Sequence, residues 1–263
     1  MISMVIWSKD RAMQLDLLLR SIQRFSKYMA YGITVLYKCS NRDHWYGYNL
    51  LQGRFPGVTF ILEGDFKHNI MEILRDSDDP YVLGNSDDNV FIDNVDGFSF
   101  PSDKFTAVSL RLSESFNFCQ PANTEMKTPK FIPQANGMLT WDWRDCCPLG
   151  GWGYPHPVDS NIYDRQYLIN LLKNGNFTNP SSMEVWMDER RDPNKPYMAC
   201  FKKAKIINVA NNRVTTGSNN TCGNASPDEL NRLYLNNKRI KVDQFDYRIT
   251  NACHIIEEYQ YED

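Results

Sequence analysis

Tyr81-Val82-Leu83-Gly84-Asn85-Ser86-Asp87-Asp88-Asn89-Val90-Phe91 joins two short apolar runs through a pair of adjacent carboxylates. Charged side chains between apolar runs cost free energy unless they have a partner. A second pair, Asp78 and Asp79, precedes Pro80 and has the composition of a solvated turn. Parallel strands of an open α/β sheet deliver their terminal side chains into the crevice where ligands bind. The stretch therefore predicts a strand that ends at a binding site, where Asp87 and Asp88 can bind a hard divalent cation.

The residues before this stretch alternate between strand and helix patterns. Strands are predicted at the apolar runs 2–7, 32–37, 58–62 and 81–83. Helices are predicted to begin at Asp10, at Ser40 with Asp43 in a pattern like a capping box, and at Asp65. This alternation predicts an α/β fold with a Rossmann-like, mostly parallel central sheet and flanking helices.

The remainder of the chain is less regular. Strands are predicted at 105–112, 131–141 and 205–209, a long polar loop at 113–130, and helices at 161–174, 180–190 and 226–235. Residues 211–224 are rich in Asn, Thr, Ser and Gly, which favours a mobile loop or lid. Because no linker interrupts the pattern, we expect one domain over 1–263, made of a ligand-binding half (1–95) and a second half (96–263).

The composition is that of an ordinary globular protein. A net charge of −3 provides no global attraction to nucleic acid, although short basic runs occur at 202–205 and 238–241. Seven cysteines without a CxxC spacing indicate neither a zinc site nor a disulfide framework. No apolar stretch approaches the length of a membrane span, and the N-terminus lacks the basic leader of a signal peptide. These features predict a soluble protein of the cytoplasm.

Further candidates lie near the predicted ligand-binding edge. The segment that follows the first strand can turn backbone amides and cations toward a nucleotide, and it contains Ser8, Lys9, Asp10 and Arg11. Lys67, at the next helix start, could neutralise the same ligand. The alternative is a helix cap with surface charges. No glycine-rich phosphate motif is present, which excludes a dinucleotide or P-loop site of the usual kind.

A second group of candidates follows Gly150 and Gly151. Trp152, Tyr154 and His156 offer aromatic faces to an acceptor, and Asp159, at the predicted start of a helix, could act as a general base kept ionised by the helix dipole. An ordinary N-cap is the alternative for Asp159, and the rival candidates for the base are Asp142, Asp145 and Glu184. His254, near the C-terminus, could complete the coordination of a cation, although a lone histidine is more often structural.

Several segments together resemble GT-A-type glycosyltransferases that use nucleotide sugars. The segments are Val5-Ile6-Trp7-Ser8-Lys9-Asp10-Arg11, Asp65-Phe66-Lys67, Ser86-Asp87-Asp88-Asn89-Val90-Phe91, Pro157-Val158-Asp159-Ser160-Asn161-Ile162-Tyr163 and Asn179-Pro180-Ser181-Ser182-Met183-Glu184. They are similar, in the same order, to segments of one bacterial and phage branch. The chain departs from the pattern because it lacks a strict Asp-x-Asp, which leaves open whether Asp87 or Asp88 touches metal, and we favour Asp88.

The resemblance implies a GT-A-like domain that transfers a sugar, usually from a UDP-sugar, with Mn²⁺ or Mg²⁺ between the diphosphate and the acidic pair. It also implies a late histidine as metal ligand, here His254, and Asp87 beside the nucleotide sugar. Phage relatives would imply a hydroxymethylated pyrimidine in DNA as acceptor, in the host cytoplasm, and bacterial relatives a glycan. A catalytically idle sugar-nucleotide or glycan-binding module and a metal-dependent nuclease or nucleotidyltransferase remain as alternatives.

Overall fold

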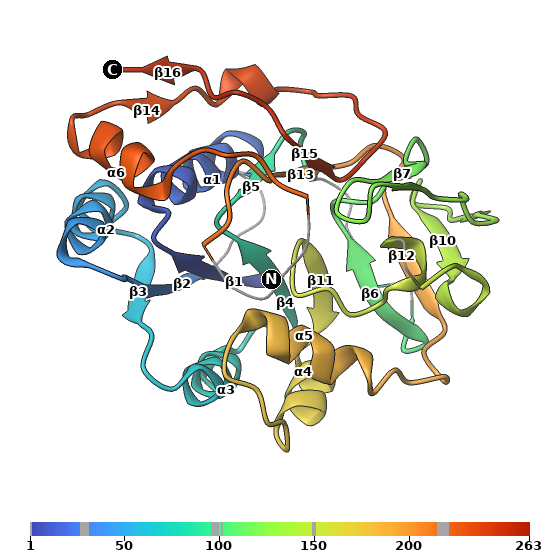
Figure 1. The fold of residues 1–263 in the computed structure, drawn as a ribbon. Helices are drawn as coiled ribbons and strands as arrows, with labels where there is room; N and C mark the ends of the chain where they lie inside the picture. Colours follow the sequence, from blue (N-terminus) through green and yellow to red (C-terminus); the bar gives the residue numbers. More distant parts are fainter. Residues whose placement is uncertain (1, 27–31, 96–99, 101, 149–150, 215–220) are drawn as a thin grey trace.

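A sheet of nine strands forms the centre of the protein (Figure 1). The computed structural model describes residues 2–26, 32–95, 100, 102–148, 151–214 and 221–263. The strand order is β3-β2-β1-β4-β11-β6-β12-β10-β9. The bounds are β1 (Ile2–Lys9), β2 (Ile33–Lys38), β3 (Thr59–Leu62), β4 (Tyr81–Ser86), β6 (Phe105–Ser109), β9 (Ile132–Pro133), β10 (Leu139–Asp142), β11 (Asn161–Asp164) and β12 (Tyr197–Cys200).

The four N-terminal strands confirm the parallel sheet that the sequence predicts. β1 pairs in parallel with both β2 and β4, and β2 pairs in parallel with β3. β1 is almost entirely buried, as expected for a strand covered on both faces. The carboxyl ends of β1 and β4 lie side by side because Trp7 pairs with Ser86. The acidic pair therefore begins one residue beyond the end of β4, beside the segment that follows β1.

The predicted helix over 161–174 is wrong in its first four residues. Residues 161–164 form β11, which pairs antiparallel with β4 and with β6. Ile162 and Tyr163 are both buried in the sheet. The helix, α4 (Arg165–Leu172), begins only after Asp164, whose side chain accepts a hydrogen bond from the amide of Tyr167. Burial between two strands thus overrides the helical spacing of the apolar residues.

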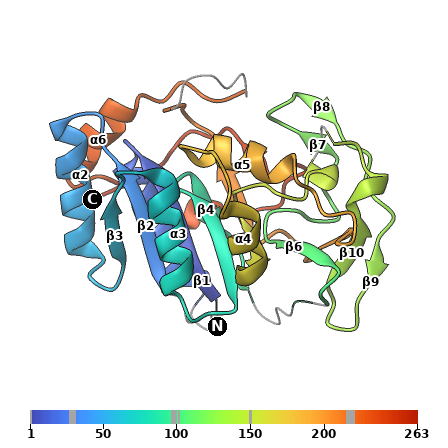
Figure 2. The same ribbon diagram turned by 90° about the horizontal axis from the view of Figure 1, so that it is seen from below.

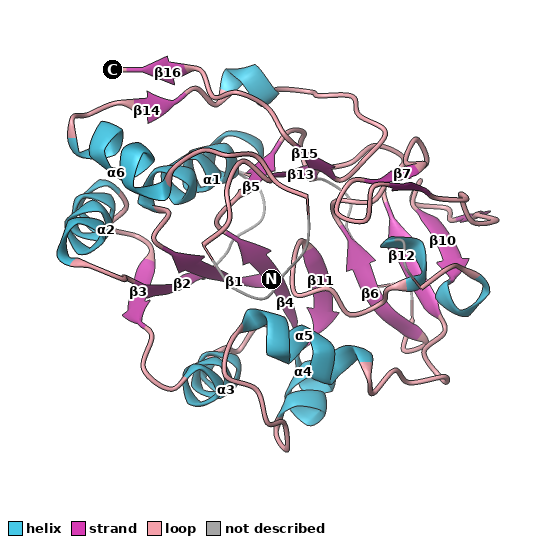
Figure 3. Ribbon diagram, viewed as in Figure 1, coloured by secondary structure: helices cyan, strands magenta, loops and turns pink. Residues whose placement is uncertain are grey.

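Helices cover both faces of the parallel part of the sheet (Figures 2 and 3). On one face lie α1 (Ala12–Phe25), α2 (Arg42–Arg54) and α6 (Pro227–Leu235), and on the other lie α3 (Phe66–Asp76), α4 and α5 (Pro180–Asp188). Asp65 caps α3, as the sequence predicts. Asn179 and Ser226 cap α5 and α6. Asn41, rather than Ser40, caps α2. The mixed α/β class is confirmed, and none of the helices in the described ranges is long and apolar enough to cross a membrane.

A smaller sheet lies beside the end of β4. Its strands are β5 (Asn89–Phe91), β13 (Ile206–Val209) and β15 (His254–Ile255), with β13 in the middle. Asn208 pairs with Asn89 on one side and with His254 on the other. This sheet therefore brings the C-terminal part of the chain to the residues that directly follow the acidic pair.

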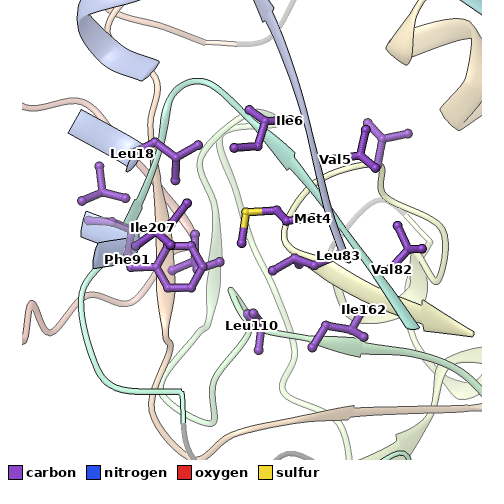
Figure 4. Packing of buried hydrophobic residues seen from close by; sticks show 14 of the residues in the cluster. Met4, Val5, Ile6, Leu18, Val82, Leu83, Phe91, Leu110, Ile162 and Ile207 are labelled. Carbon is purple, nitrogen blue, oxygen red and sulfur yellow. The ribbon is translucent and has the colours of Figure 1, made fainter. Parts of the chain in front are cut away.

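The core is continuous between the two sheets (Figure 4). Met4 and Leu83 of the large sheet are fully buried, as are Leu18 of α1, Phe91 of β5 and Ile207 of β13. Each such side chain contributes about 1.5–3 kcal/mol when it is removed from water. The two sheets and α1 consequently share one hydrophobic core next to the acidic pair.

The outer part of the chain differs from prediction in detail. The stretch 131–141 is two short antiparallel strands, β9 and β10, with Gly137 at a φ of 81° in the connection between them. The polar region 113–130 contains a small hairpin of β7 (Phe118–Cys119) and β8 (Thr124–Glu125). Near the C-terminus, β14 (Arg239–Ile240) pairs with β16 (Tyr261–Glu262). Part of the predicted lid, residues 215–220, lies outside the described residues.

Gly84 provides a test of how tightly β4 is packed at the site. A Cβ atom on this residue would lie 2.6 Å from the carbonyl oxygen of Val158 and 2.9 Å from the ring of Trp7. We expect Gly84→Ala to lower the free energy of unfolding by about 1–3 kcal/mol, measured by urea denaturation, because the backbone must shift. Gly57→Ala, where no atom lies within 4 Å of the added Cβ, is the matched control. Equal stability of the two variants would contradict the prediction.

Candidate active site

A cavity of about 540 Å³ lies at the carboxyl ends of β1 and β4. Its lining includes six charged or titratable side chains from six separate parts of the chain: Arg11, Asp88, Arg111, Asp159, Glu184 and His254. Ligand cavities in proteins typically measure about 300–1,000 Å³ and carry a few convergent polar groups. The cavity is therefore the candidate active site, and it lies at the edge of the sheet that the sequence predicts.

Arg11 holds the two carboxylates of the acidic pair together. Its Nη1 atom lies 2.9 Å from Oδ1 of Asp87 and 2.9 Å from Oδ2 of Asp88. Its Nη2 atom donates to the backbone carbonyl of Asn212 at 2.6 Å. The side chain of Arg11 is only 9% exposed, so these ion pairs lie largely out of water, where charged hydrogen bonds are strong.

The two aspartates have different surroundings. Asp87 is 3% exposed, and its Oδ2 atom accepts hydrogen bonds from the Ser8 hydroxyl (2.8 Å) and the Lys9 amide (3.1 Å). Asp88 lines the cavity, and its Oδ1 atom accepts from the Ser86 hydroxyl and the Asn208 amide group, each at 2.7 Å. Asp88 is thus the carboxylate of the pair that faces the cavity.

Burial controls the ionisation of Asp87. Desolvation raises the pKa of its carboxyl group to about 6, although Arg11 and the Ser8 hydroxyl act in the opposite direction. Burial by itself would lower the pKa of the Arg11 guanidinium. Asp87 and Asp88 act in the opposite direction and raise this pKa well above its usual range. Arg11 therefore stays charged and favours the ionised form of the pair.

Asp159 lies close to the acidic pair, but its predicted position at the start of a helix is wrong. It precedes β11, so no helix dipole keeps it ionised, and burial raises the pKa of its carboxyl group. Its Oδ1 atom accepts hydrogen bonds from the hydroxyls of Ser86 (3.2 Å) and Ser160 (3.1 Å) and from the side-chain amide of Asn89. Because Ser86 also donates to Asp88, one hydroxyl joins Asp159 to the pair.

Arg111 is a residue of the site that the sequence reasoning missed. It follows β6 and is 7% exposed, and its Nη1 atom lies 3.4 Å from Oδ2 of Asp159 and 3.4 Å from Nε2 of His254. The signal was present in Leu110-Arg111-Leu112, where a charged residue interrupts a predicted strand. A buried arginine in such a run needs anionic partners, which its neighbours supply.

His254 lies on the same side of the cavity as Arg111. Its Nδ1 atom is 3.2 Å from the sulfur of Cys253, and its Nε2 atom faces Arg111. In the parts of the chain that the structure describes, no three His, Cys, Asp or Glu side chains are placed so that they could hold a metal ion by themselves. A cation bound by Asp88 and His254 would need further ligands from a substrate.

Five of the six residues predicted to bind the nucleotide sugar do not line the cavity, namely Ser8, Lys9, Asp10, Lys67 and Asp87. The Ser8 hydroxyl and the Lys9 amide donate hydrogen bonds to Asp87. The ammonium group of Lys9 donates to the carbonyl of Val214 at 3.0 Å. Asp10 does not cap α1, because its two oxygens accept hydrogen bonds from the amide and hydroxyl of Ser40. Lys67 donates to the carbonyl of Gly175 at 2.6 Å. Of the Ser8 to Arg11 segment, only Arg11 reaches the cavity.

Two of the three residues predicted to bind the acceptor lie in the core. Trp152 is 1% exposed and packs edge to face against Trp141, with 5.0 Å between ring centroids. His156 is fully buried, its Nε2 atom is 2.8 Å from the Tyr167 hydroxyl, and burial lowers the pKa of its ring to about 3. The aromatic composition of this segment is explained by packing, and only Tyr154 lines the cavity.

Comparisons with known proteins were made by sequence and by structure. No family model matches the chain. It is 24% identical, over 283 aligned residues, to the bifunctional glycosyltransferase pgtA of Dictyostelium discoideum, and the match covers 93% of this chain and 36% of that protein. The chain thus spans about a third of the length of this curated relative.

Solved structures with a similar arrangement include two proteins. The mannosyltransferase PcManGT from Pyrobaculum calidifontis, in complex with GDP-Man and Mn²⁺, has a TM-score of 0.40 at 14% identity, over 70% of this chain and 50% of that chain. TarS 1-349 from S. aureus has a TM-score of 0.41 at 10% identity, over 78% of this chain and 59% of that chain.

Removal of Arg11 tests the charge balance of the site. Arg11→Ala leaves Asp87 and Asp88 without their cation, and we expect a loss of about 3–5 kcal/mol in the free energy of unfolding at pH 8. Without the arginine, the pKa of Asp87 rises further above its value in the unfolded chain. A carboxyl group with a raised pKa favours the folded state at low pH and loses that contribution as the pH rises. The deficit should therefore be smaller at pH 5 than at pH 8.

Urea unfolding of the wild type and the variant at both pH values measures this effect. Arg75→Ala, at an exposed arginine of α3, is the control and should show a small deficit at either pH. A deficit for Arg11→Ala that is the same at pH 5 and pH 8 would rule out the assigned role of the guanidinium.

Proposed function

We propose that the protein is a glycosyltransferase that moves a sugar from a nucleotide-sugar donor to an acceptor hydroxyl. The observation that carries the proposal is the Arg11, Asp87 and Asp88 cluster at the end of β4, beside a cavity of about 540 Å³. An open α/β sheet binds its ligands at this edge. The sequence similarity to a bifunctional glycosyltransferase over 93% of this chain supports the same assignment.

In this proposal the donor lies along the row of charged groups that begins at Arg11. The guanidinium of Arg11 already has anionic partners on one side, and a diphosphate that enters the cavity meets both this cation and Asp88. A UDP-sugar is the donor that the sequence resemblance implies. We propose that 1–263 forms one domain, in which 1–95 binds the nucleotide sugar and 96–263 binds the acceptor.

The charges of the cavity support a divalent cation, Mn²⁺ or Mg²⁺. Four carboxylates, Asp87, Asp88, Asp159 and Glu184, lie at or just below its surface, and the three arginines Arg11, Arg111 and Arg213 line it, which leaves a small excess of negative charge. An anionic diphosphate would add to this excess of negative charge. Asp88 and His254 would hold the cation, and when bound it would stabilise the charge that develops on the leaving diphosphate. The cation would then compete with Arg11 for the Oδ2 atom of Asp88.

The proposed acceptor is either DNA or a glycan. A hydroxymethylated pyrimidine in DNA is the acceptor first expected, with a glycan as the alternative. The burial of Trp152 removes one of the aromatic faces that we expected to meet an acceptor, and the described lining of the cavity balances three arginines against three carboxylates. If DNA is the acceptor, its affinity should fall steeply as the salt concentration rises, because bound counterions are released. A response to salt that is flat would favour the glycan.

The central experiment measures the release of nucleoside diphosphate. The protein is incubated with a panel of nucleotide sugars and Mn²⁺, with and without hydroxymethylated DNA or glycans. Release that depends on the acceptor supports a transferase. Donor binding without turnover would instead indicate a binding module, and cleavage of DNA strands or release of pyrophosphate would indicate nuclease or nucleotidyltransferase chemistry.

Asp88→Asn tests the residue on which the donor site depends. We expect kcat to fall by about 10²-fold or more, because a group that stabilises charge in the transition state is lost. Apparent affinity for Mn²⁺, measured by titration of the metal with donor present, should fall as well. Asp78→Asn, in the exposed acidic pair, is the matched control and should keep wild-type rates. Full metal-dependent activity in Asp88→Asn would contradict the assignment.

A further inference from the structure

We infer that Glu184, and not Asp159, accepts the proton of the acceptor hydroxyl. This inference rests on the proposed glycosyltransferase function and assigns the two sides of the cavity: Asp159 belongs to the donor side and Glu184 to the acceptor side. Both residues line the cavity, and Arg111 interacts electrostatically with both. The sequence alone could not separate them.

The contacts of Asp159 connect it to the donor side. Its Oδ1 atom accepts hydrogen bonds from three side chains, and one of them, the Ser86 hydroxyl, is also bonded to Asp88. The hydrogen bonds from Asn89 and Ser160 hold the carboxylate in place and oppose the rise in its pKa that burial causes. Such a carboxylate is suited to orient a bound sugar through its second oxygen, while Arg111 lies 3.4 Å from that oxygen.

Glu184 lies on α5, and its carboxyl group interacts with Arg111, the Tyr154 hydroxyl and the backbone of Val158. The first two residues of the helix, Pro180 and Ser181, line the cavity together with Glu184, and Tyr154 lines it from the neighbouring loop. None of these four residues belongs to the strands that hold the acidic pair. In this assignment the acceptor binds against α5 and this loop, beside Glu184.

The surroundings of Glu184 set its affinity for a proton. Burial raises the pKa of its carboxyl group to about 7, while Arg111, the Tyr154 hydroxyl and the Val158 backbone lower it and Asp159 raises it. Tyr163 of β11 also lies within electrostatic reach. A general base is most effective when its pKa is close to the working pH. Glu184 meets this condition, and its interaction with the Tyr154 hydroxyl and the Val158 backbone holds it at the lining of the cavity.

The reaction balances without any further reagent. The acceptor hydroxyl gives its proton to the Glu184 carboxylate as the acceptor oxygen bonds to the anomeric carbon. The bond from that carbon to the diphosphate oxygen breaks, and the nucleoside diphosphate leaves with the electron pair. Glu184 then returns the proton to solvent. A single displacement of this kind inverts the configuration at the anomeric carbon.

Glu184→Gln tests the assignment because it keeps the shape of the side chain and removes its basicity. We expect kcat for acceptor-dependent transfer to fall by about 10²–10⁴-fold, while the dissociation constant of the donor, measured by calorimetry, stays within about twofold of wild type. In the wild type, kcat/KM should rise with pH through about 7, because the base must be deprotonated. This rise, the rising limb of the pH profile, should be absent in Glu184→Gln. Glu189→Gln, at an exposed position that follows the same helix, is the control.

A second variant keeps the inference testable if Glu184→Gln folds poorly. Tyr154→Phe removes a hydroxyl that lowers the pKa of Glu184, so the rising limb of kcat/KM should move to higher pH. Asp159→Asn should weaken donor binding and move the rise of kcat/KM to lower pH, because the charge of Asp159 raises the pKa of Glu184. The inference is overturned if Glu184→Gln keeps kcat within about threefold and keeps its limb, or if Tyr154→Phe leaves the limb in place. A wild-type protein that binds no nucleotide sugar would instead refute the proposed function itself.

Discussion

The ion pairs of Arg11 with Asp87 and Asp88 are the interaction on which the site depends. Two carboxylates on adjacent residues repel each other, and largely removed from water neither would stay ionised without a nearby cation. Arg11 supplies that cation from the segment after β1, and its third contact, to the carbonyl of Asn212, reaches across 201 residues of sequence. The same side chain therefore joins the first strand, the acidic pair and the C-terminal half of the chain.

The sequence predicts the parallel half of the fold because local patterns decide it. The apolar runs at 2–7 and 58–62 and the cap at Asp65 each specify their element without help from distant residues. β11 could not be predicted in this way. Its apolar residues also fit a helix, and only pairing with β4 and β6, far away in sequence, makes them a strand.

The site was predictable to the extent that it lies at the ends of local elements. Arg11 and Asp88 follow strands that the pattern identifies, and both line the cavity. Arg111 was missed because its partners, Asp159 and His254, are brought to it by tertiary structure. Trp152 and His156 were assigned to a ligand because aromatic and imidazole groups suit both a binding site and a core. Composition does not distinguish these two uses, and burial does.

The small sheet of β5, β13 and β15 has a consequence for how the protein is made. Asn208 bonds to Asp88 and Asn89 across separations of 120 and 119 residues, and it pairs with His254 on its other side. Contacts between residues far apart in sequence form slowly, because the intervening chain must be ordered first. During synthesis from the N-terminus, the parallel strands can therefore assemble early, while the cavity is completed only after β15 has left the ribosome. Until then the newly made domain is a scaffold in which the cavity is still incomplete on this side.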